Sequence, residues 1–124
     1  MIEGRFTDDK ELIFDIELVA TNGEKFKIEA LLDTGFTDGW LAINTQDLEA
    51  LGWSLLTSQI QLQTAQGKAR FNIYEGKIII DSVEVIIPVH VGDDLPDTIL
   101  GSFWLDIIQL IINKQNGIFT LEIL

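Results

Sequence analysis

The stretch EALLDTGFTDGW, residues 29–40, decides how this chain is interpreted. An apolar run, residues 30–32, leads directly into Asp33, Thr34 and Gly35. An ionised carboxylate is unfavourable in an apolar setting unless it is paired or hydrogen-bonded, and a glycine permits a sharp turn. Asp33 is therefore either an ordinary turn residue at the end of a strand or a carboxylate that is held there for chemistry.

Composition indicates a single globular domain over residues 1–124. The chain has 124 residues, of which 47% are hydrophobic, so it can bury a substantial core. It contains no cysteine, which excludes disulfides, thiolate catalysis and cysteine-based zinc sites, and which is compatible with a reducing compartment. The first residues lack the basic and then apolar pattern of a secretory signal. We therefore expect a cytoplasmic protein.

The charge balance argues against two classes of partner. Eight Lys and Arg residues stand against 20 Asp and Glu residues, which gives a formal charge of −12. Nucleic-acid binding requires a basic surface that neutralises phosphates, and anionic membranes attract basic segments. No uncharged apolar run is long enough for a membrane-spanning helix. We expect neither a nucleic-acid partner nor a membrane partner.

Hydrophobic periodicity predicts a mainly β chain. Strands are expected over residues 11–20, 26–32, 40–43, 59–64, 69–80, 82–91, 98–101, 108–113 and 118–124. Pro88 suggests that its strand is an edge strand or irregular. A short helix is expected over residues 44–52, capped by Asn44 or Thr45 and ended by Gly52. One further helical turn is expected over residues 102–107, capped by Ser102. Many short strands with few helices indicate a barrel or a sandwich.

Two further segments accompany the Asp-Thr-Gly tripeptide, which alone is a weak signal. A hairpin tip of small residues, TAQGKAR, occupies residues 64–70, and TILGSFWL occupies residues 98–105 with an apolar pair before Gly101. This order resembles the retropepsin-like aspartic proteases, the single-lobe relatives of pepsin, over nearly the whole chain. The resemblance implies a mainly β, single-lobe acid-protease fold, a closed barrel with one or two short helices.

Details of the motifs indicate which branch of the family the chain resembles. The loop is most similar to a bacterial and archaeal branch that carries a Phe after Asp-Thr-Gly, here Phe36. Retroviral members usually have Ala or Ser at that position, so the bulky ring departs from the viral pattern and implies different subsites. Related hairpin tips often read Ala-Asp-Gly, whereas this chain has Ala65, Gln66 and Gly67.

The resemblance implies an aspartic endopeptidase with Asp33 as its catalytic residue. Two adjacent carboxyl groups share one proton, so one takes a proton from water while the other donates to the peptide carbonyl. Neither a metal nor an organic cofactor is needed. The chain has one Asp-Thr-Gly and is too short for two lobes, so an active enzyme would be a homodimer. Thr34 would tie the two loops together, and Gly35 would allow the turn.

Other residues follow from the same resemblance. The residues expected to bind a peptide or protein substrate are Phe36, Thr37 and Asp38 in the loop and Ala65, Gln66 and Gly67 in the hairpin over the cleft. The residues expected to support the catalytic loop are Ile99, Leu100 and Gly101. Asp38 could favour a polar or basic substrate side chain. In this family the terminal strands of two subunits interleave, which is a use for the apolar strand over residues 118–124.

Alternatives remain beside the enzyme. The chain could be a catalytically silent homodimer of the same fold that binds peptides or a partner protein, or a structural β-domain in which Asp-Thr-Gly is a coincidence. We expect His90 to be a structural histidine with satisfied polar atoms. The three Trp residues, Trp40, Trp53 and Trp104, should pack in the core or an interface. The acidic run at residues 92–97 is expected to be a solvated loop rather than a cation site.

Overall fold

A computed structural model describes residues 1–64 and 67–124 of the chain. These residues form eleven strands and two short helical segments. The strands, in chain order, are β1 (Ile2–Glu3), β2 (Arg5–Phe6), β3 (Leu12–Val19), β4 (Lys25–Leu32), β5 (Leu41–Asn44), β6 (Ser54–Thr64), β7 (Gly67–Ile80), β8 (Val83–Gly92), β9 (Thr98–Leu100), β10 (Ile108–Asn113) and β11 (Ile118–Ile123). The helical segments are α1 (Thr45–Leu48) and the 3₁₀ turn η1 (Ser102–Asp106).

Alternating side chains build the first hairpin. Along β3, Phe14, Ile16 and Leu18 are buried, while the residues between them are partly exposed. Successive side chains of a strand point to opposite faces of the sheet, so this pattern presents one apolar face to the core. The turn to β4 contains Gly23 in the left-handed region, with φ of 90°, and Asn22, whose side chain accepts a hydrogen bond from the Glu24 N–H.

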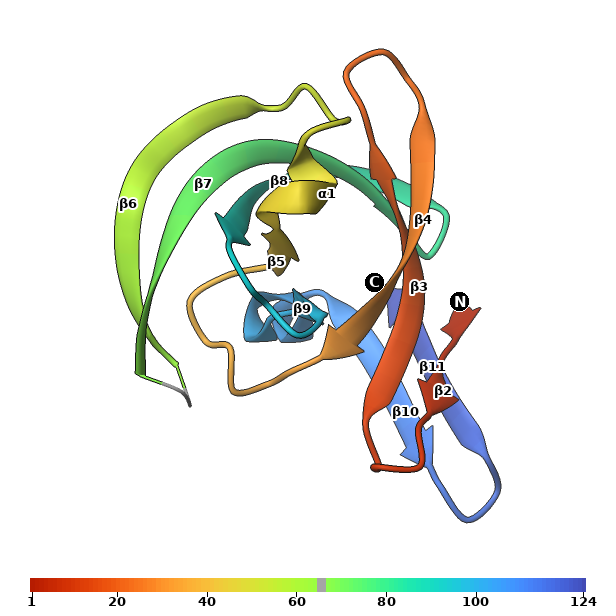
Figure 1. The fold of residues 1–124 in the computed structure, drawn as a ribbon. Coiled ribbons are helices and arrows are strands. Elements are labelled where there is room, and N and C mark those ends of the chain that lie inside the picture. The colour runs from red at the N-terminus through yellow and green to blue at the C-terminus, as the bar shows by residue number, and fades with distance from the viewer. Residues whose placement is uncertain (65–66) are drawn as a thin grey trace.

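The main sheet closes on itself to form a barrel. Its strand order is β2-β3-β4-β9-β5-β8-β7-β6, and β3 also pairs with β7. The closing contact joins Glu17 and Leu18 to Ile79 and Ile78. The ring therefore runs through β3, β4, β9, β5, β8 and β7, while β2 and β6 lie outside it. Figure 1 shows β6 and β7 curving together around one side of the barrel.

Strand β9 lies between two strands that are consecutive in the chain. It pairs in parallel with β4, with Leu32 opposite Leu100, and antiparallel with β5, with Leu41 opposite Leu100. The loop between β4 and β5 must therefore pass around the end of β9. This topology fixes both ends of the loop that contains Asp33, because each end leaves a strand that is paired with β9.

A second sheet of three strands packs against the barrel, in the order β1-β11-β10. The chain passes from this sheet to the barrel at Gly4, whose N–H donates to the Phe119 carbonyl at 2.7 Å. A Cβ at Gly4 would overlap the Phe119 ring, so the crossing requires a glycine. The rings of Phe14 and Phe119, both buried, lie 4.3 Å apart and join the two sheets. Figure 1 shows the β10–β11 hairpin extending away from the barrel.

Asn44 lies at the N-cap position of α1, as predicted, but it makes no side-chain cap hydrogen bond, and the C-cap residue is Glu49 rather than Gly52. The α-helix covers only Thr45–Leu48, and neither helical segment has a side-chain cap. The Asn44 side chain instead holds the acidic loop, because its Oδ1 accepts from the Leu95 N–H and its Nδ2 donates to the Leu95 carbonyl. The Thr45 hydroxyl donates to Asp93 at 2.6 Å. The residue at the cap position of η1 is Gly101, not Ser102.

The start of β6 differs from expectation, whereas Pro88 lies at a position where its strand is paired on one side only, as expected. Strand β6 begins at Ser54, earlier than predicted, with register irregularities between Leu55 and Ile60. Pro88 lies in a strand with neighbours on both sides, but β5 pairs with β8 only over residues 90–92. At Pro88 itself β8 is therefore paired by β7 alone, opposite Glu75. This placement allows a residue without an N–H to lie within a barrel strand.

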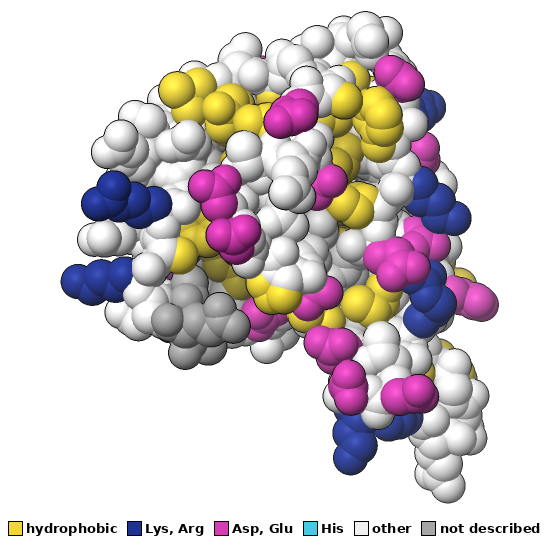
Figure 2. All heavy atoms as spheres, viewed as in Figure 1, with side chains coloured by type: hydrophobic (Ala, Val, Ile, Leu, Met, Phe, Trp, Pro, Cys, Tyr) yellow, Lys and Arg dark blue, Asp and Glu magenta, His cyan; other side chains and the backbone are white. Residues whose placement is uncertain are grey.

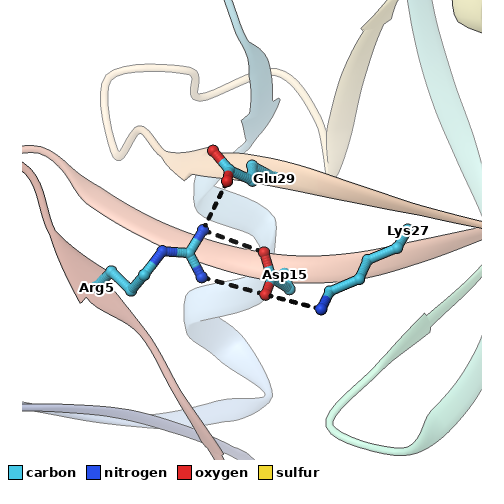
Figure 3. Close-up of polar contacts among 4 residues, drawn as sticks. All are labelled: Arg5, Asp15, Lys27 and Glu29. Atoms are coloured by element: carbon cyan, nitrogen blue, oxygen red, sulfur yellow. Dashed lines mark hydrogen bonds and ion pairs between the residues drawn. The ribbon is translucent and has the colours of Figure 1, made fainter.

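A charge cluster ties β2, β3 and β4 together (Figure 3). Asp15 lies directly opposite Glu29 across the β3–β4 pair, where two like charges repel. The Arg5 guanidinium offsets this repulsion, because it binds both oxygens of Asp15 at 3.1 Å and the Glu29 carboxylate at 3.2 Å. Hydrogen bonding by Arg5, with a further contribution from Lys27, lowers the pKa of Asp15.

The surface reflects the acidic composition. Figure 2 shows acidic side chains dispersed over one face, with apolar side chains exposed among them. No helix in the described part of the chain is both long enough and apolar enough to cross a membrane.

Candidate active site

Asp33 follows β4 and is held by the neighbouring strand. Its N–H donates to the Leu100 carbonyl at 2.9 Å, which continues the β4–β9 pairing one residue beyond Leu32. Leu32 and Leu100 are buried, whereas Asp33 is half-buried. The apolar strand thus delivers the carboxylate to the end of the barrel sheet, with a backbone position fixed from two sides.

The turn after Asp33 is organised by its own side chain. The Gly35 N–H donates to Oδ1 of Asp33 at 2.9 Å, and the Phe36 N–H donates to the Asp33 carbonyl at 3.1 Å. Such side-chain-to-backbone bonds are characteristic of Asp in turns. Oδ2 of Asp33 has no hydrogen-bond partner among the described residues. The side chains of Thr34, Thr37 and Asp38 are exposed, so this turn faces out of the single chain.

The start of η1 holds the other half of the loop. The Ser102 N–H donates to the Phe36 carbonyl at 2.8 Å. The Trp40 carbonyl accepts two bonds, one from the Gly101 N–H at 2.9 Å and one from Nε1 of Trp104 at 2.7 Å. A Cβ at Gly101 would overlap the Gly39 carbonyl oxygen, so only a glycine permits this close approach.

A cluster of rings lies beneath the loop. The His90 ring on β8 meets Phe36 edge-on at 5.2 Å and Phe71 at 5.8 Å, and a Cβ at Gly39 would come within 2.9 Å of Nδ1 of His90. His90 is buried, and its Nδ1 has no hydrogen-bond partner among the residues that the structure describes. The expectation of a histidine with satisfied polar atoms is therefore wrong. Burial lowers the pKa of His90, and the Asp38 carboxylate opposes this shift.

The predicted site residues divide into two groups. The structure brings the Asp33–Asp38 loop together with Ile99, Leu100 and Gly101 through the β4–β9 pairing and the η1 contacts. Gly67 belongs to a different element, the start of β7 in the β6–β7 hairpin, with φ of 111°. Ala65 and Gln66 lie outside the described residues.

The three tryptophans pack in the core or against it, as predicted. Trp53 is buried, and its Nε1 donates to the Val19 carbonyl at 2.9 Å. Trp104 is buried, and its ring meets that of Trp40 edge-on at 4.9 Å. Trp40 is partly buried and also contacts Phe103. The rings of Trp40 and Trp104 therefore connect η1 to the end of the loop that carries Asp33, whereas Trp53 packs within the barrel.

Surface hollows occur away from Asp33. One has a volume of about 270 Å³ and is lined by Thr45, Gln59, Arg70, Phe71, Asn72, Val91, Gly92 and Asp93. A second, of about 260 Å³, is lined by Asn44, Thr45, Gln46, Asp93 and Asp94. Neither includes Asp33. The sequence carries no signal for these polar hollows, because their residues come from separated segments with no shared motif. Among the described residues, no group of three His, Cys, Asp or Glu side chains could hold a metal ion.

Comparison with known proteins identifies the fold. No protein-family model matches the chain, and no curated protein matches its sequence. A solved structure titled EIAV protease, complexed with the inhibitor HBY-793, matches with a TM-score of 0.63 and 18% identity, covering 82% of this chain and 91% of its own. A retropepsin-like aspartic protease from Rickettsia conorii matches with a TM-score of 0.59 and 26% identity, covering 96% of this chain and 86% of its own.

The two solved structures bear on the predicted fold class but not on the predicted branch of the family. Membership of the branch with Phe after Asp-Thr-Gly stays a prediction. Both neighbours are titled as proteases, one of them as a retropepsin-like aspartic protease, and both match over most of the chain. The chain therefore has the mainly β, single-lobe retropepsin-like barrel, and the predicted fold class is confirmed.

Proposed function

We propose that this chain is an aspartic endopeptidase that acts as a homodimer with one Asp33 from each copy. The observation that carries the proposal is the placement of Asp33. Its backbone is anchored to β9, its Oδ1 is held by the Gly35 N–H, and its turn faces outward. The fold neighbours are aspartic proteases, which supports the same reaction class.

The proposed chemistry uses water as the nucleophile. Across a two-fold axis the two carboxyl groups would lie close together and share one proton. The ionised group takes a proton from a bound water, which attacks the peptide carbonyl carbon, while the protonated group donates to the carbonyl oxygen. Collapse of the resulting diol expels the amine, which receives a proton from the dyad. The proposal requires no metal and no organic cofactor.

The exposed part of the loop supports a second copy as the missing half. Thr34 and Gly35 are exposed in the single chain, next to a carboxylate with an unpaired Oδ2 among the described residues. A dimer would cover these residues, and the Thr34 hydroxyls would hold the two loops in register. This arrangement makes the interface isologous, so that the same surface of each copy meets its twin.

The terminal strands constrain how the two copies meet. Strand β11 is paired on one side by β1 and on the other by β10 within the same chain. The expected interleaving through residues 118–124 would therefore require a strand of the partner to replace β1, which pairs only with Thr120 and Leu121. Strand β10 is at the edge of its sheet, with Ile111 and Ile112 45% and 48% exposed. An apolar edge strand favours pairing with another chain, so we assign β10 to the interface.

Substrate binding is assigned to the two sides of the proposed cleft. Phe36, Thr37 and Asp38 would line one wall, and the β6–β7 hairpin with residues 65–67 would cover the substrate. Asp38 would favour a basic side chain near the scissile bond, because its carboxylate is exposed at the end of the loop. Matched peptides with Lys or Glu at that position should be cleaved at different rates, and equal rates would remove this role for Asp38. We also propose that the protein acts in the cytoplasm.

A peptide-library digestion tests the enzyme directly. Purified chain should cleave peptides somewhere between acidic and neutral pH, and a statine-type transition-state mimic should block cleavage. Asp33→Asn should abolish cleavage while leaving the thermal transition unchanged or higher, because the Asn side chain keeps an oxygen that can accept from Gly35. Asp9→Asn is the matched control, since Asp9 is exposed in the turn before β3.

The outcomes separate the three alternatives. Cleavage that persists in Asp33→Asn would refute the assigned role. A dimer that binds peptides or the mimic but cleaves nothing would be the catalytically silent homodimer. Sedimentation that shows only monomers at high protein concentration, with no cleavage and no binding, would leave a structural β-domain.

A further inference from the structure

His90 is an unusual residue to find beneath this loop. It is the only histidine of the chain, it is 6% exposed, and Nδ1 has no hydrogen-bond partner within the described residues. A buried polar atom without a partner lowers stability, because nothing replaces the hydrogen bond that it makes with water in the unfolded chain. An apolar side chain of similar size would avoid this cost, so the imidazole calls for an explanation.

The contacts of His90 are concentrated on the loop after Asp33. Its ring meets the edge of Phe36, and Gly39 approaches so closely that a Cβ there would lie 2.7 Å from Cε1 and 2.9 Å from Nδ1. The unpaired nitrogen therefore faces the loop backbone rather than solvent. Because the interior of a protein is close-packed, a change in the ring is transmitted to Phe36 and Gly39.

The charge around His90 comes from the same loop. In register with His90, β5 presents Ala42 and β7 presents Ile73, and both are buried and apolar. The flanking ring is Phe71. The charged group that acts on the imidazole is Asp38, which favours the protonated ring, whereas burial disfavours it more strongly and lowers the pKa of His90.

We propose that His90 is a positioning residue, whose neutral ring holds the Phe36–Gly39 segment in the arrangement that accepts substrate and whose protonation displaces that segment. This inference rests on the proposed function, because it assigns the segment to substrate binding. A buried imidazolium needs a partner. Asp38, the carboxylate that acts on the ring, or a water molecule could serve as this partner, and a bond to either would displace the segment from its present contact at Gly39. Acid would therefore weaken substrate binding below the pKa of His90.

Nuclear magnetic resonance tests the coupling without any need for cleavage. The single histidine gives one Cε1–H signal in the whole chain. We expect its titration to have a midpoint below the ordinary value of 6.5, and we expect the Asp38 and Gly39 amide signals to shift with the same midpoint. The Asp9→Asn protein should show the same titration. A midpoint at or above 6.5, or Asp38 and Gly39 amides that do not follow it, would overturn the proposal.

Binding of a statine-type inhibitor provides the second readout. If only the neutral-His90 form binds, the apparent Kd in the wild type rises up to about tenfold per pH unit below the His90 midpoint, since affinity scales with the competent fraction. His90→Phe keeps an aromatic ring but cannot titrate, so this rise should be lost and leave only the dependence due to the dyad. His90→Leu serves if the Phe variant does not fold. An unchanged pH dependence in the variants would overturn the inference.

The two proposals fail in different ways. The proposed function is contradicted if the wild-type chain cleaves nothing or if the Asp33→Asn variant still cleaves. In either case the resonance signals of His90, Asp38 and Gly39 still show whether protonation of His90 moves the loop. Conversely, the enzyme could be active while KM has the same pH profile in the wild type and in His90→Phe. That result would leave the proposed dyad intact and would contradict the positioning role of His90. If His90 were purely structural, its replacement would lower stability but would not change the pH profile of KM relative to that of kcat.

Discussion

The close contact between Gly101 and the Asp33 loop makes Gly101→Ala the sharpest test of the site geometry. An added Cβ would overlap the Gly39 carbonyl oxygen and would lie 2.8 Å from Cδ2 of Phe36 and 3.0 Å from the Gly39 carbonyl carbon. Carbon atoms in favourable contact are about 3.5–4.0 Å apart. The Phe36 ring can rotate away, but the Gly39 carbonyl belongs to the backbone, so the loop itself must move.

The expected loss follows from what that movement breaks. The next carbonyl, that of Trp40, accepts bonds from the Gly101 N–H and from Nε1 of Trp104. Losing two hydrogen bonds costs about 2 kcal/mol, and overpacking adds about 1–3 kcal/mol. We therefore expect Gly101→Ala to lower the free energy of unfolding by about 3–5 kcal/mol. For a domain of this size that corresponds to a fall in Tm of roughly 10–20 °C.

Gly117→Ala is the matched control for this measurement. Gly117 lies in the β10–β11 turn with φ of 67°, and no described atom comes within 4 Å of where its Cβ would be. Its replacement carries backbone strain of about 1–2 kcal/mol without overlap. Urea unfolding followed by Trp fluorescence should be run at equal protein concentration, because dimerisation shifts apparent stability.

Two results would refute the reasoning about Gly101. The first is a Gly101→Ala protein no less stable than Gly117→Ala. The second concerns Phe36→Ala in the Gly101→Ala background. Removing the ring should restore only a small part of the stability, since the overlap with Gly39 remains. Full restoration would mean that the ring, and not the backbone, limits the approach.

Two further predictions concern the packing around the loop and the surface cluster. Trp104→Phe should lower the free energy of unfolding by about 2–4 kcal/mol, because it removes buried volume and the bond to the Trp40 carbonyl; a loss equal to that of an exposed Phe103→Leu change would contradict this. Arg5→Gln should lower Tm by less than about 4 °C at neutral pH. Because the pKa of Asp15 is lowered in the fold, this difference should disappear as the pH falls below its ordinary value of 3.8; a difference that persists in acid would rule out the ion pair.

Local patterns of the sequence were sufficient to predict most strands. Alternation identified β3, β4 and β8, and the apolar residues before Asp33 and Gly101 placed β4 and β9. These predictions work because one-sided burial imposes a period of two on a strand. The very short strands β1 and β2 carry no such period, since each has two residues, and they were not predicted.

Non-local contacts account for the predictions that failed. Asn44, Thr45 and Ser102 have the side chains of helix caps, but Asn44 and Thr45 bind the acidic loop some 50 residues away, at Leu95 and Asp93. A tertiary partner that satisfies the same polar atoms competes with capping, and sequence spacing does not reveal it. The pairing of β1 with β11 likewise depends on the path of the whole chain, because it joins residues at the two ends of the sequence.

Several departures from ordinary packing meet at the loop after Asp33, and they support the proposed function. Asp33 places a carboxylate after an apolar strand, Gly101 approaches the Gly39 backbone more closely than a Cβ allows, Gly39 lies against the His90 and Phe36 rings, and His90 leaves a buried nitrogen unpaired in the described structure. Each of these features lowers stability compared with a simple apolar alternative. Sequences commonly tolerate such losses where a site needs fixed polar groups. A structural β-domain would have no reason to collect them around a single outward-facing turn, whereas a loop that must present an acid to its twin would.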